Sequence, residues 1–392
     1  MSNIKANIWK LYAGTFLTEL LFIAAIIVPF LSVLGLSMEE ILITEAIYSL
    51  AILIAEVPSG YFADRVGRKI SIILGALFWI IGISFYAFFG GFFWISIGAL
   101  FWGIGSSFNS GANEAMLYET LMQLGREKEY KKVQGNIFFY GRIAAVIGSV
   151  SAGFMAAGDL KIPAYATLLA VIVWFFLSLS LKETRHELEE KEAWQHFKRI
   201  LKESLLHDKQ LRYFLLFTAI GGFFAIEFWL AQKYWGFLGV SIVYFGLLVA
   251  GMNIFSAFAS KYAKEIENKI GEKEALLVIP IVPIIVWFIF ANVSVLWIIP
   301  LFFITTGLRG FMVPVFNDFI QKHSTFDRRA TIMSVKSLLE KMVFFVFAPL
   351  LGAVTDVYSI QTAFLIIAGI LAVFAAASLF TLRRVKIIGL LS

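Results

Sequence analysis

Twelve long stretches of consecutive apolar residues dominate this chain and limit the folds open to it. A helix needs roughly 20 apolar residues to cross a hydrocarbon core of about 30 Å, and each stretch meets or approaches that length. The strands of a membrane barrel would instead alternate polar and apolar residues over about ten positions. The sequence therefore predicts an all-α polytopic membrane protein. Its expected spans are 11–33, 40–62, 70–89, 92–118, 134–157, 163–181, 213–232, 241–260, 275–292, 295–318, 331–354 and 360–382.

The composition indicates lipid as the surrounding solvent and excludes several chemistries. Only 15% of the residues are charged, against about 25% in soluble domains. The absence of cysteine excludes disulfides, thiolate catalysis and cysteine-ligated metals. The four histidines are not paired at metal-ligand spacing, and no glycine-rich loop with a lysine and a serine is present to bind a nucleotide phosphate. We therefore expect no catalytic residue, no metal and no cofactor, and we do not expect an enzyme.

Lysines and arginines are distributed asymmetrically between the two sides of the expected spans. Of the 33, only Lys161 and Lys233 fall in or beside connections on one side, four lie inside spans, and the remaining 27 lie on the opposite side. Positive residues accumulate on the cytoplasmic side of membrane proteins. Both termini are therefore expected to face the cytoplasm. Because the basic residues are spread over many short loops, they do not form a nucleic-acid-binding face.

The longest connection divides the spans into two groups of six. The expected organisation is an N-terminal six-helix bundle over 1–181, a cytoplasmic linker over 182–212 and a C-terminal six-helix bundle over 213–392. Within the linker, apolar residues recur at helical spacing among charged neighbours, which predicts an amphipathic helix on the inner membrane surface. These residues are Trp194, Phe197, Leu201 and Leu205.

The segment GYFADRVGRK occupies the short cytoplasmic turn between the second and third expected spans. It resembles the signature of the major facilitator superfamily, which has glycine, three variable residues, aspartate, arginine, one variable residue, glycine, arginine and lysine. The matching residues are Gly60, Asp64, Arg65, Gly67, Arg68 and Lys69. Through its topology the resemblance covers nearly the whole chain. It implies the twelve-helix fold of that superfamily, with two pseudo-symmetric six-helix bundles.

The resemblance implies that this turn is a conformational latch on the cytoplasmic side. Gly60 and Gly67 would suit a turn too tight for a side chain. Asp64 can accept hydrogen bonds from backbone N–H groups at the start of a neighbouring helix, and in the family it locks the two halves together. Arg65 and Arg68 would also hold the loop inside by their charge, which is a purely topological alternative.

Other family patterns are kept in part. The counterpart of the signature between spans 8 and 9, SKYAKEIENKIGEKE, keeps Gly271 but has no aspartate–arginine pair. The span-5 pattern of proton-driven exporters appears as AAVIGSVSAG, with Gly148 and Gly153 kept and Ser149 in place of proline. Small residues there allow close helix packing. The segment NDFIQKHSTFDRRATIMS before span 11 resembles bacterial drug-exporter-like members, so the resemblance points to the drug/proton-antiporter branch.

Ionisable residues inside spans are costly and usually mark a pathway. Spans 3, 6, 9 and 12 carry none, and in the superfamily these four are the peripheral, lipid-facing helices. The embedded charges of the other spans are therefore expected to line a central cavity, together with polar side chains. The candidate substrate-cavity residues are Asn113, Glu114, Arg142, Asn253, Arg309, Glu340 and Lys341. Static ion pairs are the alternative, with Glu114 bound to Arg142 and Arg309 bound to Glu340.

Two embedded carboxylates are candidates for proton coupling. Glu19 and Glu227 have no cation three or four residues away in their own spans. Burial without a partner favours the neutral form of a carboxyl group, which suits proton exchange. For Glu227 the alternative is a position near the outer end, where it would be solvated or paired with Lys233.

Secondary active transport by alternating access fits these features, with two bundles rocking about a central site. The preferred interpretation is proton-coupled export of a small organic compound or drug, with the proton gradient as energy source. One alternative is an uptake carrier or symporter for a small organic ion, in which Arg142, Arg309 and Lys341 bind an anionic group. Another is a lipid-translocating protein. We expect a monomer with the lipid bilayer and a small-molecule substrate as partners, in the cytoplasmic membrane of a bacterium or archaeon.

Overall fold

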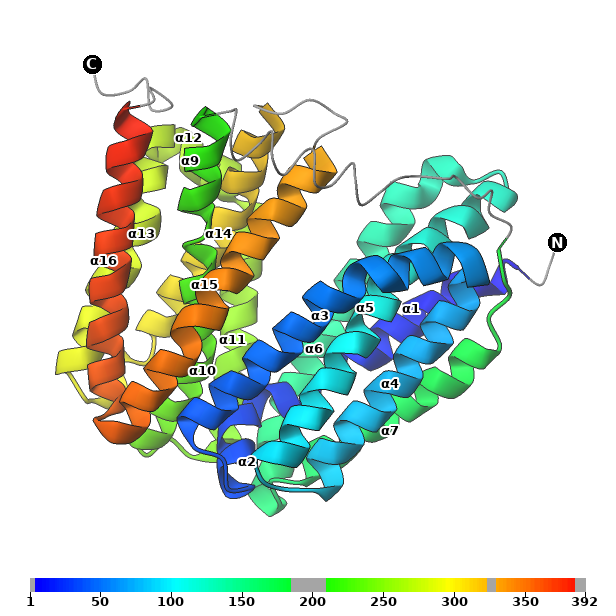
Figure 1. Cartoon of the computed structure of the whole chain (residues 1–392), viewed down its shortest axis with the longest axis horizontal. Helices are drawn as coiled ribbons and strands as arrows, with labels where there is room; N and C mark the ends of the chain where they lie inside the picture. Colours follow the sequence, from blue (N-terminus) through cyan, green and yellow to red (C-terminus); the bar gives the residue numbers. More distant parts are fainter. Residues whose placement is uncertain (1–3, 185–208, 323–328, 385–392) are drawn as a thin grey trace. The chain divides into compact units, whose positions relative to one another are not determined.

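The computed structural model describes residues 4–184, 209–322 and 329–384 of the 392-residue chain (Figure 1). Within these residues all regular secondary structure is helical. The helices of the first half are α1 (Ala6–Glu19), α2 (Ile27–Val33), α3 (Met38–Val66), α4 (Arg68–Phe88), α5 (Phe92–Gln123), α6 (Tyr130–Gly158) and α7 (Ile162–Leu179). Those of the second half are α9 (Lys209–Thr218), α10 (Gly221–Phe237), α11 (Ile242–Lys261), α12 (Ala263–Ile270), α13 (Glu272–Asn292), α14 (Leu301–Lys322), α15 (Arg329–Val357) and α16 (Ile360–Arg384). The amphipathic helix predicted around Trp194, Phe197, Leu201 and Leu205 lies outside the described residues.

Eleven helical stretches in the described ranges are long and apolar enough to cross a membrane. They match eleven of the twelve predicted spans. The remaining predicted span is the fourth, 92–118, which falls in α5. This helix has 32 residues but mixes polar side chains with two carboxylates, Glu114 and Glu119. The prediction of an all-helical, multi-pass membrane protein is confirmed.

The first and seventh spans are each interrupted at membrane depth, which the sequence analysis did not predict. Helix α1 ends at Glu19, Leu20 leaves the helical region with φ −69° and ψ 48°, and a short 3₁₀ helix (Phe22–Ile26) leads into α2. In the seventh span, α9 ends at Thr218 and α10 begins at Gly221. Irregular backbone at this depth is tolerated only where protein or a water-filled cavity surrounds it.

The chain forms two compact units. The first comprises Met1–Leu36, Ile43–Glu190 and Ser241–Ala250, and the second comprises Ser37–Leu42, Lys191–Val240 and Gly251–Ser392. Helices α3 and α11 therefore contribute residues to both units. The division into bundles over 1–181 and 213–392 stays a prediction.

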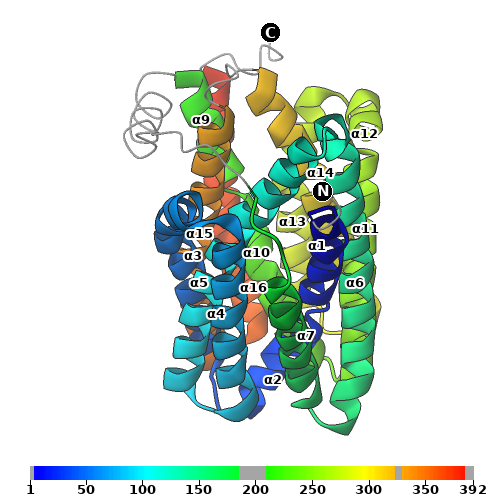
Figure 2. The same ribbon diagram turned by 90° about the vertical axis from the view of Figure 1, so that its right-hand side faces the viewer.

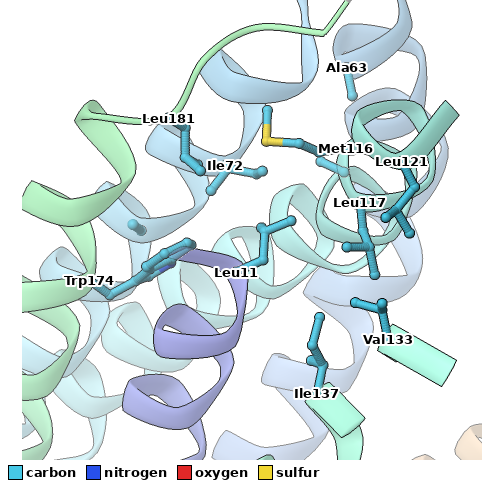
Figure 3. Close-up of a cluster of buried hydrophobic side chains, with 12 residues drawn as sticks. Leu11, Ala63, Ile72, Met116, Leu117, Leu121, Val133, Ile137, Trp174 and Leu181 are labelled. Atoms are coloured by element: carbon cyan, nitrogen blue, oxygen red, sulfur yellow. The ribbon is translucent and has the colours of Figure 1, made fainter. Parts of the chain in front are cut away.

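In the first unit, α1 packs against α6 and α7, and α4 packs along α5 (Figure 2). Figure 3 shows the apolar centre of this packing, where Leu11 of α1 lies between Trp174 of α7 and Leu117 of α5. All three side chains are buried. Gly14 makes the approach of α7 possible, because a Cβ atom there would overlap the ring of Trp174. Helix association in lipid depends on such close van der Waals contact.

The N-terminal end of α1 is hydrogen-bonded to the segment that follows α7. The Asn7 side chain donates a hydrogen bond to the carbonyl of Lys182 (2.8 Å) and accepts one from its N–H (2.9 Å). Lys10 Nζ donates to the carbonyl of Ser180 (2.5 Å). The predicted start of span 1 at residue 11 left Lys10 in the tail. It lies instead inside α1, buried, where it satisfies one of the free carbonyls at the end of α7.

Helix α6 and the first half of α11 are in backbone contact within the first unit. A Cβ atom at Gly246 would overlap the carbonyl oxygen of Ser149, and one at Gly153 would overlap the carbonyl oxygen of Val243. The small residues of span 5 therefore do allow close helix packing, as the sequence suggested, and α11 supplies the matching glycine.

In the second unit, α13 packs along α16, and α15 contacts α9, α10 and α16. Aromatic side chains fill the space between these helices. The rings of Phe290 and Phe302 stack with centroids 4.1 Å apart, and Phe364 and Tyr234 pack against them. This rigid aromatic core holds α10 and α14, which carry the embedded charges described next.

Candidate functional site

The signature turn holds a network of charged side chains around Arg68. Helix α3 ends at Val66, Gly67 takes a φ of 125°, and α4 begins at Arg68. The Arg68 guanidinium pairs with Asp64 (Nη1 to Oδ1, 2.6 Å) and with Glu119 of α5 (Nε to Oε1, 3.2 Å). The side chains of Arg68 and Glu119 are only 15% and 11% exposed, so the pair is shielded from solvent.

A carboxylate from beyond α7 completes this network. Glu183 accepts hydrogen bonds from the N–H groups of Arg68 (2.9 Å) and Lys69 (3.1 Å), which are the first two residues of α4. A negative charge at this position is stabilised by the free N–H groups and the dipole of the helix. The hydroxyl of Thr184 donates to the second oxygen of Glu119. The network therefore joins α3, α4, α5 and the segment after α7 within the first unit.

Three of the residues that build this network could not be recognised in the sequence. Glu119, Glu183 and Thr184 lie outside the signature, and each is far along the chain from it. The expectation for Gly60 changes as well. Gly60 lies inside α3 with no described atom within 4 Å of its Cβ position, so the tight turn is confined to Gly67. Arg65 is exposed and stacks over the Tyr61 ring at 5.0 Å.

The second unit repeats the backbone conformation of the turn. Gly271 connects α12 to α13 with φ 96° and ψ 148°, close to the φ 125° and ψ 152° of Gly67. Here Glu267 of α12 and Glu272 of α13 act on the charge of Lys322 at the end of α14, which is 2.6 Å from Asp318. Burial and the neighbouring Glu272 raise the pKa of Glu267. The sequence copy is degenerate, but its backbone conformation and a charged cluster are retained.

In the first unit the break of span 1 carries an interhelical ion pair. Arg142 of α6 pairs with Glu19, the last residue of α1. Gly141 allows the helices to approach, because a Cβ atom there would lie 3.1 Å from Thr15 and 3.3 Å from Glu19. A cation is also favoured at the C-terminal end of a helix. Glu19 therefore has the partner that its own span lacks.

The alternative pairing of Arg142 with Glu114 is not found. Glu114 is exposed on α5, and no cation among the described residues lies within 4 Å of it. One residue earlier, Asn113 is half-buried, and its Oδ1 atom has no hydrogen-bond partner within the described parts of the chain. Of these candidates in the first unit, Glu19 and Arg142 therefore form a pair, and Glu114 has no ion-pair partner among the described residues.

Glu227 lies in the middle of α10 and is 2% exposed. It accepts a hydrogen bond from the hydroxyl of Thr305 on α14 (2.5 Å). The buried Trp287 indole lies beside it but outside hydrogen-bonding geometry. Neither alternative for Glu227 is found, since it is not solvated and no described cation, Lys233 included, lies within 4 Å.

Glu340 of α15 has a different partner from the one considered in the sequence analysis. Lys336, one turn earlier on the same helix, lies 3.3 Å from it and also approaches Asn317 of α14 (3.4 Å). Gly221, the first residue of α10, makes room for the carboxylate, because a Cβ atom there would lie 2.9 Å from Glu340 Oε1. An Arg309–Glu340 ion pair does not form.

These contacts join α10, α14 and α15 into one polar seam within the second unit. We define the polar seam as Glu227, Thr305, Arg309, Asn317, Lys336 and Glu340. Of the other candidates in this unit, Asn253 is exposed on α11 and Lys341 is half-buried on α15. Neither makes a hydrogen bond or ion pair with a described residue. Arg309 is exposed on α14.

A multi-pass chain with this signature turn, whose described residues form only helices, has the features of a membrane transporter. The sequence matches the family model described as Major Facilitator Superfamily over residues 11–346. The chain therefore belongs to the Major Facilitator Superfamily of secondary transporters. No curated protein matches the sequence.

Solved structures of transporters share the fold at low sequence identity. The nucleoside transporter NupG superposes with a TM-score of 0.81 at 15% identity, covering 96% of this chain and 98% of NupG. A bacterial homolog of the human lysosomal transporter Spinster gives 0.75 at 12% identity, covering 97% of each chain. The POT family transporter PepTSo gives 0.73 at 12% identity, covering 97% of this chain and 98% of its own. These similarities establish the fold and leave the substrate open.

Proposed function

We propose that the protein exports a small organic compound across the membrane in exchange for protons, by alternating access. Family membership supplies the transport mechanism. The coupling step rests on one observation: the carboxyl group of Glu227, deep in a membrane span, is held by a hydroxyl group and has no cation within 4 Å among the described residues.

Glu227 suits proton coupling because its charge has no compensating partner in direct contact. Gain or loss of one proton there changes the net charge of the polar seam by one unit. Arg309 lies one helical turn from Thr305 on α14, so this change acts on the nearest guanidinium. Glu19 is the second candidate, and it would first have to separate from Arg142.

The two interrupted spans and the signature turn provide places where the chain can move. Transporters of this kind bind substrate near the midplane beside broken helices. The breaks after Glu19 and before Gly221 each adjoin an embedded acid. On this proposal, the network of Asp64, Arg68 and Glu119 holds the cytoplasmic ends of α3, α4 and α5 while the transport cycle proceeds.

Everted membrane vesicles with an inward-acidic pH gradient test this proposal. The gradient is followed with a fluorescent probe while uridine, salicylate or tetraphenylphosphonium is added to vesicles with wild-type protein, Glu227→Gln, or empty vector. Glu265→Gln, an exposed carboxylate of α12 outside the spans, is the matched control. We expect at least one compound to collapse the gradient with the wild type and with Glu265→Gln, and not with Glu227→Gln.

Other outcomes separate the alternatives. Collapse that persists in Glu227→Gln would move the coupling role to Glu19. No protein-dependent collapse with any compound would favour an uptake carrier for a small organic ion or a lipid translocator over proton-coupled export.

A further inference from the structure

Arg309 is an exposed arginine halfway along a membrane-spanning helix. Helix α14 runs from Leu301 to Lys322, and the predicted and observed spans both place residue 309 near the bilayer midplane. A charge at that depth costs at least about 2.5–3.5 kcal/mol when it faces lipid. An exposed side chain in this position is therefore expected to face a polar or water-filled space.

The side of α14 that carries Arg309 also carries Asn317, which contacts α15. Residues 309, 313 and 317 are spaced by four and lie on one side of the helix. Asn317, two turns from Arg309, accepts a hydrogen bond from Lys336 of α15. Gly310, on another face, packs its backbone against Ser256 of α11. Helix α14 thus contacts α11 through Gly310 and α15 through Asn317, and Arg309 lies on the same side of the helix as Asn317.

The guanidinium has no direct partner among the described residues, although two carboxylates flank it. Glu227 of α10 and Glu340 of α15 both act on its charge. Each has a different contact, Glu227 with Thr305 at 2.5 Å and Glu340 with Lys336 at 3.3 Å. A guanidinium carries five N–H donors in a planar fork, and here all five remain available to a ligand.

The other embedded arginine is in the opposite situation. Arg142 of the first unit is paired with Glu19, so its charge is compensated by the protein itself. The two arginines that the sequence placed together as anion-binding candidates are therefore not equivalent. Only Arg309 combines membrane depth, exposure and an unfilled set of donors.

We propose that Arg309 binds an oxyanion group of the transported compound, a carboxylate or a phosphate, so that the substrates are organic anions or zwitterions. This inference rests on the proposed transport function and assigns its substrate class. The planar fork matches carboxylate and phosphate oxygens in a bidentate geometry, which lysine cannot reproduce. Glu227, Glu340, Lys336 and Arg309 together carry no net charge when all four are ionised, so the site is near neutrality when no substrate is bound.

Ligand binding to the purified full-length protein tests the proposal. The probes are uridine 5′-monophosphate and salicylate as oxyanions, uridine as the neutral match of the nucleotide, and tetraphenylphosphonium as a cation. Affinities are measured for the wild type, Arg309→Gln and Arg309→Lys. Arg126→Gln is the control, because it removes the same charge at a position outside the spans, where the side chain pairs with Glu129.

We expect at least one oxyanion probe to bind the wild type and Arg126→Gln equally. Arg309→Gln should weaken that binding about 10- to 100-fold, and Arg309→Lys, which keeps the charge and loses the fork, should weaken it less. Affinity for uridine should be unchanged by either substitution. A merely structural arginine would affect all ligands alike, so the ratio between the nucleotide and uridine is the decisive readout. Should Arg309→Gln fail to fold, the nucleotide-to-uridine affinity ratio is measured with Arg309→Lys instead.

Failure of both oxyanion probes to bind the wild type would overturn the inference, as would an unchanged nucleotide-to-uridine ratio in the variants. The result is distinguishable from failure of proton-coupled export. Proton exchange driven by a neutral or cationic compound would sustain the proposed function while this inference falls. Arg309-dependent anion binding without gradient collapse would support this inference and contradict proton-coupled export.

Discussion

The Oε2 atom of Glu183 lies 2.6 Å from the position that a Cβ atom would take at residue 67. Two independent constraints therefore meet at Gly67, its φ of 125° and the carboxylate packed against its α-carbon. The same carboxylate accepts hydrogen bonds from the first two N–H groups of α4. Glu183 can approach those groups only because residue 67 lacks a side chain.

Gly67→Ala should therefore destabilise the protein by about 1–3 kcal/mol, because the substitution strains the backbone and displaces Glu183. Gly60→Ala is the matched control, since Gly60 lies in the interior of α3 with open space around it. Alanine there should be neutral or stabilising by about 0.5–1 kcal/mol. Thermal unfolding of the two purified variants measures the difference. Equal midpoints would contradict the assignment of the tight turn to Gly67 alone.

Arg68 and Glu119 should show energetic coupling. Their side chains are largely shielded, so removal of either leaves the charge of the other less well compensated. In a double-mutant cycle with Arg68→Gln and Glu119→Gln, we expect a coupling energy of about 1–3 kcal/mol. The more exposed Arg126–Glu129 pair provides a comparison and should couple more weakly, because solvent screens it. Coupling energies of equal size in the two cycles would argue against a shielded network.

The backbone contact between α6 and α11 should tolerate no added methyl group. Gly246→Ala places a Cβ atom on the carbonyl oxygen of Ser149, and the backbone cannot move aside as a flexible side chain could. We expect a loss of about 1–3 kcal/mol together with reduced transport. Gly236→Ala, at a glycine with no described atom within 4 Å of its Cβ position, should leave both unchanged. Thermal midpoints and vesicle transport measure the pair, and a fully active, equally stable Gly246→Ala would disprove the close packing.

The features that sequence patterns predicted well are those encoded over short distances. The spans depend on continuous apolar runs, and the signature turn is ten contiguous residues, so both could be identified. The contact of Lys336 with Glu340 could also have been predicted, because a spacing of four residues on a helix brings side chains together. The paired glycines 221 and 222 could similarly have indicated the interruption of span 7.

Contacts between distant helices could not be predicted, because they depend on which helix faces meet. Glu19 and Arg142 were each recognised as embedded charges, but their pairing requires the end of α1 to lie beside Gly141 of α6. Glu119 reaches Arg68 across 51 residues of chain. The absence of an Arg309–Glu340 ion pair also depends on which helix faces meet, because Glu340 contacts Lys336 instead.

The charged cluster beside Gly271 in the second unit should make stability depend on pH in a defined direction. Burial and Glu272 raise the pKa of Glu267, so folding favours the protonated carboxyl group. The contribution of this group is fully present below the unfolded pKa of about 4.3 and is lost as the pH rises through the folded value. Glu267→Gln mimics the neutral form at every pH.

Thermal midpoints of the wild type and Glu267→Gln should therefore coincide near pH 4 and separate as the pH rises to 7, with the variant higher by on the order of 1 °C. Glu265→Gln, an exposed carboxylate on the same helix, should show no such separation. If Glu267→Gln were instead less stable at pH 7, attraction to Lys322 would outweigh burial and the repulsion from Glu272. In that case the cluster would depend on the charged form of Glu267, as the cluster around Arg68 depends on Glu119.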